Sequence, residues 1–281
     1  MFVYKYTKSK VIHKSCPQCG IVMHRGVEKI LKNAVKIIDI YKKEWYNKNA
    51  MDMQKIIEKY KKEIFEQKRE IFEKFRAILL EYNEKYNLTS ILDEEGIYYK
   101  HFLDSALGAE CIEKNARVAE VGSGAGFPSI VLKILRPDIS FDLFESIAKK
   151  CEFLKAVVDK LELSNVHIYN LRAEESGKDK NFREKYDIVT ARAVARMNTL
   201  CEYCMPLVKV GGKFIAYKGG NTEEIDEAKT AIKTLGGRIS EVISYALPND
   251  FGERTLAIVE KTKPTPPRYP RGQGKERKNP L

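Results

Sequence analysis

The stretch Val118-Ala-Glu-Val-Gly-Ser-Gly-Ala-Gly126 joins a short apolar segment to three glycines at alternate positions. Glycine permits a tight turn and lets a ligand approach the backbone closely. Dinucleotide-binding folds use the same device where a strand turns into a helix. The stretch therefore predicts a strand–turn–helix unit with a ligand site at the turn, and a glycine-rich turn without a ligand is the alternative.

Short apolar runs and amphipathic segments alternate from this stretch to the last strand. We expect strands at residues 117–121, 140–144, 166–169, 186–190, 213–217, 238–244 and 255–260, with the last two paired as a hairpin. We expect helices at residues 127–135, 147–161, 197–208 and 222–235. This alternation predicts an α/β fold in which helices cover both faces of a doubly wound, mainly parallel sheet, over residues 115–262.

Residues 51–114 are expected to form an N-terminal helical cover for this sheet. From Met51 to Glu95 the chain has no Gly or Pro, and apolar residues recur at steps of three, four or seven. The run is long for one globular helix, so we expect a break near residues 67–70 and a second helical segment after Asp93.

The net charge of +11 is concentrated at the two ends of the chain. Residues 1–50 carry +8 and residues 261–281 carry +6, whereas residues 51–260 carry −3. Basic arms suit a polyanion such as nucleic acid, and solvated tails are the alternative. The Pro-rich basic tail of residues 263–281 has the same two interpretations: it orders along a phosphate backbone, or it is disordered in solvent.

Residues 1–50 are interpreted as a disordered basic extension or as sequence upstream of the true start. His13, Cys16, Cys19 and His24 form a potential zinc site, but the set is more compact than usual finger spacing, so we expect no metal. Four further cysteines are expected to be buried thiols without a role: Cys111, Cys151, Cys201 and Cys204. The absence of a long apolar run predicts a cytoplasmic protein.

Two features of the glycine turn favour S-adenosylmethionine as its ligand over a nicotinamide dinucleotide. The Gly122, Gly124 and Gly126 spacing lacks the third glycine at the dinucleotide position, and Glu120 beside it is suited to a nearby cation. Glu145, at the end of the second strand, is expected to accept both ribose hydroxyls, a role that it would share with dinucleotide enzymes.

Two later segments are expected to complete this site. Arg172-Ala173-Glu174 follows the third strand, so it borders the adenine, although a simple helix cap is the alternative. Arg192 ends the apolar fourth strand, where a buried charge is costly unless it meets an anion or a carbonyl. We therefore interpret Arg192 as a site residue.

Several segments together resemble the bacterial small-subunit ribosomal RNA methyltransferase G family, formerly called glucose-inhibited division protein B. They are Tyr86-Asn-Leu-Thr-Ser, His101-Phe-Leu-Asp104-Ser, Glu120-Val-Gly-Ser-Gly-Ala-Gly-Phe-Pro128, Glu145-Ser-Ile-Ala-Lys-Lys, Thr190-Ala-Arg-Ala-Val-Ala and Tyr269-Pro-Arg. The resemblance covers about residues 51–281. It departs at Glu120, where the family often has Asp, and at Ser129, where glycine is common.

The resemblance implies a Rossmann-like class I methyltransferase that makes N7-methylguanosine in the 530 loop of 16S rRNA, free or within the 30S subunit, from S-adenosylmethionine. No obligate protein partner and no membrane are expected. The cofactor residues are then Gly122, Gly124, Phe127, Glu145, Ala173, Glu174 and Arg192. The catalytic residues are Arg192, His101 and Arg254, and the RNA-binding residues are Lys149, Arg172, Arg254, Arg268 and Arg271.

Guanine N7 carries a free lone pair, so its methylation needs no general base. We expect Arg192 or Arg254 to hold the guanine O6 or a phosphate, and Phe127 to support the target base. Two alternatives remain open from the residues: a nicotinamide-dependent oxidoreductase on the same fold, and a non-catalytic zinc and RNA-binding protein built on residues 1–50.

Overall fold

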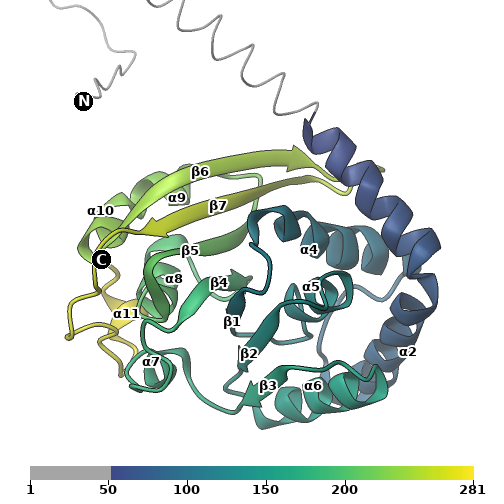
Figure 1. The fold of residues 1–281 in the computed structure, drawn as a ribbon, viewed down its shortest axis with the longest axis horizontal. Coiled ribbons are helices and arrows are strands. Elements are labelled where there is room, and N and C mark those ends of the chain that lie inside the picture. The colour runs from purple at the N-terminus through teal and green to yellow at the C-terminus, as the bar shows by residue number, and fades with distance from the viewer. Residues whose placement is uncertain (1–51) are drawn as a thin grey trace, which may run out of the picture. The chain divides into compact units, whose positions relative to one another are not determined.

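A seven-stranded sheet organises residues 52–281, the part of the chain that the computed structural model describes (Figure 1). Its strands are β1 (Arg117–Val121), β2 (Ser140–Phe144), β3 (Val166–Tyr169), β4 (Tyr186–Arg192), β5 (Val208–Gly219), β6 (Gly237–Ala246) and β7 (Glu253–Lys261). The spatial order is β3-β2-β1-β4-β5-β7-β6, and only the pairs made by β7 are antiparallel. The predicted doubly wound, mainly parallel sheet and its final hairpin are confirmed.

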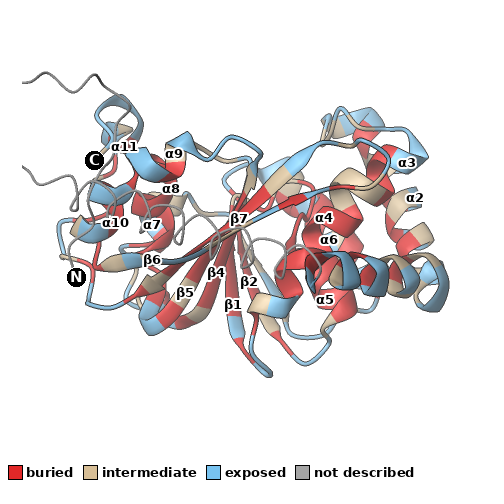
Figure 2. Cartoon of the chain, turned by 90° about the horizontal axis from the view of Figure 1, so that it is seen from above, coloured by how far each residue is buried: buried red, intermediate tan, exposed pale blue. Residues whose placement is uncertain are grey.

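Helices cover both faces of the sheet, as predicted. Figure 2 shows α2 to α6 on one side of the strands and α7 to α11 on the other. The helices that follow β1 are α5 (Ser129–Leu135), α6 (Ala148–Lys160), α7 (Ala173–Ser176), α8 (Met197–Cys204), α9 (Glu223–Glu227), α10 (Lys229–Thr234) and α11 (Lys275–Lys278). Each face has its own apolar core, because side chains alternate across a strand.

Within the described residues, the N-terminal cover is helical from residue 52 to residue 62 and continues through the π-helical turn η1 (Glu63–Gln67). Lys68 leaves the helical region at φ −118° and ψ 19°, so the predicted break is confirmed. The chain continues as α2 (Arg69–Tyr86), which ends at the left-handed residue Asn87. The second helical segment consists of α3 (Glu94–Gly96), η2 (Ile97–Leu103), α4 (Asp104–Leu107) and η3 (Gly108–Cys111).

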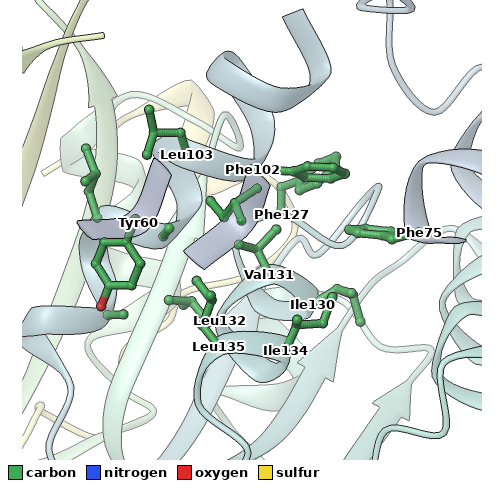
Figure 3. Close-up of a cluster of buried hydrophobic side chains, with 14 of the residues drawn as sticks. Tyr60, Phe75, Phe102, Leu103, Phe127, Ile130, Val131, Leu132, Ile134 and Leu135 are labelled. Carbon is green, nitrogen blue, oxygen red and sulfur yellow. The ribbon is translucent and has the colours of Figure 1, made fainter. Parts of the chain in front are cut away.

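Aromatic side chains join this cover to the sheet layer (Figure 3). The ring centroid of Phe75 on α2 lies 5.4 Å from that of Phe102 on η2 and 5.4 Å from that of Phe127 before α5. All three side chains are buried. Burial of one such ring contributes about 1.5–3 kcal/mol, so the cover is held mainly by apolar packing.

Two predicted helices differ from the structure. The helix expected over residues 197–208 ends at Cys204, since Pro206 cannot continue it, and Val208 already belongs to β5. β5 is longer than the strand predicted over residues 213–217: Val208 already pairs with Tyr186, and after a register shift Lys213 pairs with Ile188. The helix expected over residues 222–235 divides at Ala228 into α9 and α10.

The tail of residues 263–281 packs against the protein, so its interpretation as a solvated tail is wrong. Tyr269 and Glu276 are buried. The Arg183 guanidinium donates to four carbonyl oxygens, three of which, those of Thr265, Pro266 and Tyr269, belong to the tail. Buried polar contacts of this kind fix a segment that composition alone marks as loop.

The remaining predictions concern the cysteines, the potential zinc site, the domain boundaries and membrane spans. Cys151, Cys201 and Cys204 are buried, whereas Cys111 is half-buried. The potential zinc ligands lie outside the described residues. Residues 52–281 cluster as one unit, and the predicted boundaries at residues 114 and 262 stay predictions. Within the same range, each helix is too short or too polar to cross a membrane.

Candidate functional site

The glycine turn after β1 has the conformation that its sequence predicts. Gly122, Gly124 and Gly126 have φ values of +71°, +54° and +80°. A Cβ at Gly122 would lie 2.6 Å from Val194, and one at Gly126 would lie 2.6 Å from Ile130. At Gly124 the nearest atom is a carbonyl oxygen 3.7 Å away. Neighbouring side chains therefore leave no room for a side chain at Gly122 or Gly126, whereas the space beside Gly124 is open.

Glu145 at the end of β2 holds this turn in place. Its Oε2 accepts from the Gly124 N–H at 2.9 Å, and its Oε1 accepts from the Ile147 N–H at 2.8 Å. The side chain is buried. Each carboxylate oxygen can accept a second hydrogen bond, so the predicted contact with the ribose is compatible with this arrangement and stays a prediction.

Glu120 is a buried acid behind the turn with incomplete hydrogen bonding. Its Oε2 accepts from the Ser129 N–H at 3.1 Å, while its Oε1 and the hydroxyls of Ser123 and Ser129 have no partner. Burial raises the pKa of Glu120 to about 8. Unpaired buried polar atoms are rare in folded proteins, and each one calls for an explanation such as an ordered water or an ion. Glu120 is fully buried and lies outside the cavity lining, so the predicted cation beside it stays a prediction.

A cavity of about 350 Å³ lies at the carboxyl ends of β1 and β2. Such ends are where doubly wound folds bind ligands, and here the strand order reverses between β1 and β4. The predicted cofactor residues Gly122, Ala173 and Glu174 line it, as does Arg172. The other predicted cofactor residues lie outside its lining, namely Gly124, Phe127, Glu145 and Arg192.

Arg192 at the end of β4 belongs to a second cluster, centred on Asp104. Its Nη1 donates to Asp104 Oδ2 at 3.0 Å and to the Lys100 carbonyl at 3.1 Å. Tyr245 Oη donates to Asp104 Oδ1 at 2.8 Å, and Arg254 Nε lies 3.9 Å from the same oxygen. The predicted carbonyl and anion partners of Arg192 are thus both present within the protein.

His101 connects this cluster to the helical cover. Arg192 Nη2 lies 3.1 Å from its Nδ1, and the Thr89 hydroxyl lies 2.9 Å from its Nε2. Burial and the Arg192 charge lower the pKa of His101 to about 3. The imidazole is therefore neutral at physiological pH, with Nδ1 accepting from Arg192 and Nε2 donating to Thr89.

Phe127 is less available than the sequence suggests. Its ring stacks on His101 with a centroid distance of 4.4 Å, and the Arg192 guanidinium lies 5.0 Å from the ring centre. Only 5% of the residue is exposed. The expectation that Phe127 supports a target base is therefore wrong, because its ring is packed within the protein.

The predicted RNA-binding residues fall into two groups. Lys149, Arg172 and Arg268 are exposed, so their contacts with RNA stay predictions. Arg271 instead donates through Nε and Nη2 to the fully buried carboxylate of Glu202, at 2.9 and 2.7 Å. Its guanidinium holds the tail to α8, which leaves less of it free for a phosphate.

Sequence reasoning missed three residues of the Arg192 cluster, namely Thr89, Asp104 and Tyr245. Asp104 stands three residues after His101, which is one helical turn, and that spacing was the available signal. Tyr245 lies on β6, 141 residues from Asp104, and no local pattern marks it.

Comparisons with known proteins match most of the chain. The family model described as rRNA small subunit methyltransferase G matches residues 68–250. Proteins named "Ribosomal RNA small subunit methyltransferase G" from Exiguobacterium sibiricum and Acetivibrio thermocellus are 47% and 45% identical. Each match covers 74% of this chain and 89% or 86% of the relative. The protein of the same name from Listeria monocytogenes is 47% identical, and that match covers 73% of this chain and 87% of the relative. The chain therefore belongs to the ribosomal RNA small subunit methyltransferase G family.

Proposed function

We propose that this chain transfers a methyl group from S-adenosylmethionine to guanine N7 in the 530 loop of 16S ribosomal RNA. The observation that carries this proposal is the open glycine turn with the unpaired, buried Glu120 Oε1 behind it. The turn offers space for a ligand, and the acid calls for a positively charged group. Family membership adds the reaction class and leaves the oxidoreductase alternative without support.

The residues around the turn fit the parts of the cofactor. We assign the unpaired oxygens of Glu120, Ser123 and Ser129 to its ammonium group. We assign Glu145, which holds the turn, to the ribose, and Ala173-Glu174, which lines the cavity, to the adenine. When bound, S-adenosylmethionine supplies a methyl group on a positively charged sulfur.

The task of the protein is to orient the guanine, because N7 already has a free lone pair. Orientation can contribute several kcal/mol to such a reaction. The neutral His101 accepts from Arg192 and removes no proton, so we assign it a positioning role. Of the two arginines, Arg254 is better suited to hold O6 or a phosphate, since most Arg192 donors are bonded internally.

Exposed cations are assigned to the RNA backbone. Lys149, Arg172 and Arg268 lie on the surface, where they can neutralise phosphates. The substrate is free 16S rRNA or the 30S subunit, and an enzyme with either substrate works in the cytoplasm without an obligate protein partner.

The test is methyl transfer by the purified protein. Radiolabelled S-adenosylmethionine should label 16S rRNA or 30S subunits from a strain that lacks this gene, and mapping should place N7-methylguanosine in the 530 loop. Arg254→Ala should reduce the rate strongly, while Arg238→Ala, an exposed arginine of the same hairpin, should not. Labelling of neither RNA, or of a position outside that loop, would overturn the proposal.

A further inference from the structure

The C-terminal tail is attached to one face of α8 by buried polar contacts. Thr199, Glu202 and Tyr203 lie three and four residues apart, so they point to the same side of the helix. Glu202 is fully buried and pairs with Arg271, and the Thr199 hydroxyl donates to the Glu276 carbonyl at 2.9 Å. Figure 1 shows α11 beside α7 and α8. The tail is therefore a fixed part of this side of the protein.

This attachment brings the tail to the cavity beside the glycine turn. Gly274 and Arg277 line that cavity together with Gly122, Ala173 and Glu174. Arg277 Nε donates to the Tyr203 hydroxyl at 3.3 Å, and Tyr203 lines the cavity too. A Cβ at Gly274 would meet nothing within 4 Å, so the tail leaves space at this point.

We propose that Arg277 is a cofactor-binding residue that closes the adenine end of the S-adenosylmethionine site from the C-terminal tail. This inference rests on the proposed function. The cavity lies outside the carboxyl ends of the strands, where a doubly wound fold binds its nucleotide. The proposed function assigns the adenine to Ala173 and Glu174, and Arg277 lines the same cavity. A guanidinium is planar and stacks on aromatic rings, and it also donates to ring nitrogens.

An RNA phosphate is the competing ligand for Arg277, and two observations favour adenine. Glu174 lines the same cavity, and its carboxylate offsets one of the two positive charges there, those of Arg172 and Arg277, which makes the cavity less favourable for a phosphate. Tyr203 orients the guanidinium through a hydrogen bond at the cavity edge. Exposed cations without such an anchor, for example Lys278, are more suitable for a mobile backbone.

The experiment measures the affinity of the full-length protein for S-adenosylhomocysteine and for adenosine by calorimetry. Arg277→Ala should weaken both ligands by about tenfold, since both contain the adenine that loses its contact. Arg277→Lys should not restore affinity, because an ammonium cannot stack as a plane. Lys278→Ala removes the same charge from the neighbouring residue and should bind both ligands like wild type.

The outcomes separate this inference from the proposed function. If wild-type protein binds neither ligand, the proposed function fails and the inference fails with it. If wild type binds both and Arg277→Ala binds equally well, the inference alone is overturned. A variant with unchanged ligand affinity and a raised KM for 30S subunits would assign Arg277 to RNA instead. Thermal unfolding of each variant verifies that the tail stays folded.

Discussion

Replacing Glu120 with Gln tests the charge state of the acid behind the glycine turn. Burial raises the pKa of Glu120 from 4.5 to about 8, so the folded protein binds a proton that the unfolded chain releases above pH 4.5. The contribution of Glu120 to the free energy of unfolding is therefore most favourable below pH 4.5, and it is lost as the pH rises from 4.5 to 8. The loss amounts to about 1.4 kcal/mol per pH unit.

Between pH 5.5 and 7.5 the effect therefore reaches about 3 kcal/mol. Gln has nearly the shape of a neutral Glu and can still accept from the Ser129 N–H, but it does not titrate. The free energy of unfolding of Glu120→Gln should rise relative to wild type by this amount over the interval. Urea unfolding at pH 5.5, 6.5 and 7.5, at constant ionic strength and without cofactor, measures the difference.

A matched control is Glu84→Gln, which removes an exposed carboxylate from α2. It shows the general effect of removing one carboxylate. If the Glu120→Gln difference stays constant with pH, Glu120 is ionised in the folded protein, and the reasoning from its burial is refuted.

Three further predictions follow from the same region. Gly122→Val should abolish S-adenosylhomocysteine binding and also lower Tm, because its Cβ would lie 2.6 Å from Val194; an unchanged Tm would contradict this packing. Asp104→Asn should cost about 3 kcal/mol in urea unfolding, since it leaves Arg192 without its buried carboxylate, whereas Tyr245→Phe should cost about 1 kcal/mol. Cofactor binding at pH 7 should release a proton from Glu120, so the calorimetric heat should depend on the buffer's ionisation enthalpy; equal heats would argue against an ammonium beside this acid.

The strands around the site could be predicted closely from sequence. The predicted bounds of β1, β2 and β3 coincide with the observed ones, because each is an apolar run bordered by turn residues. Arg192 was identifiable because a charge at the end of an apolar strand needs a partner. Its partner Asp104 was not, since an acid within a helical segment has the same local pattern whether it is exposed or buried.

The amino-acid sequence alone determined the order of strands and helices, the glycine turn and the family. Backbone sterics and side-chain periodicity act over a few residues, so these features can be predicted from short stretches of sequence. The tertiary structure decided that Asp104, Arg192 and Tyr245 meet, that Glu120 is buried with an unpaired oxygen, and that the tail reaches the cavity. Those results depend on which distant parts of the chain pack together and exclude water. This packing decides which charged side chains pair, and burial shifts the pKa of a group such as Glu120.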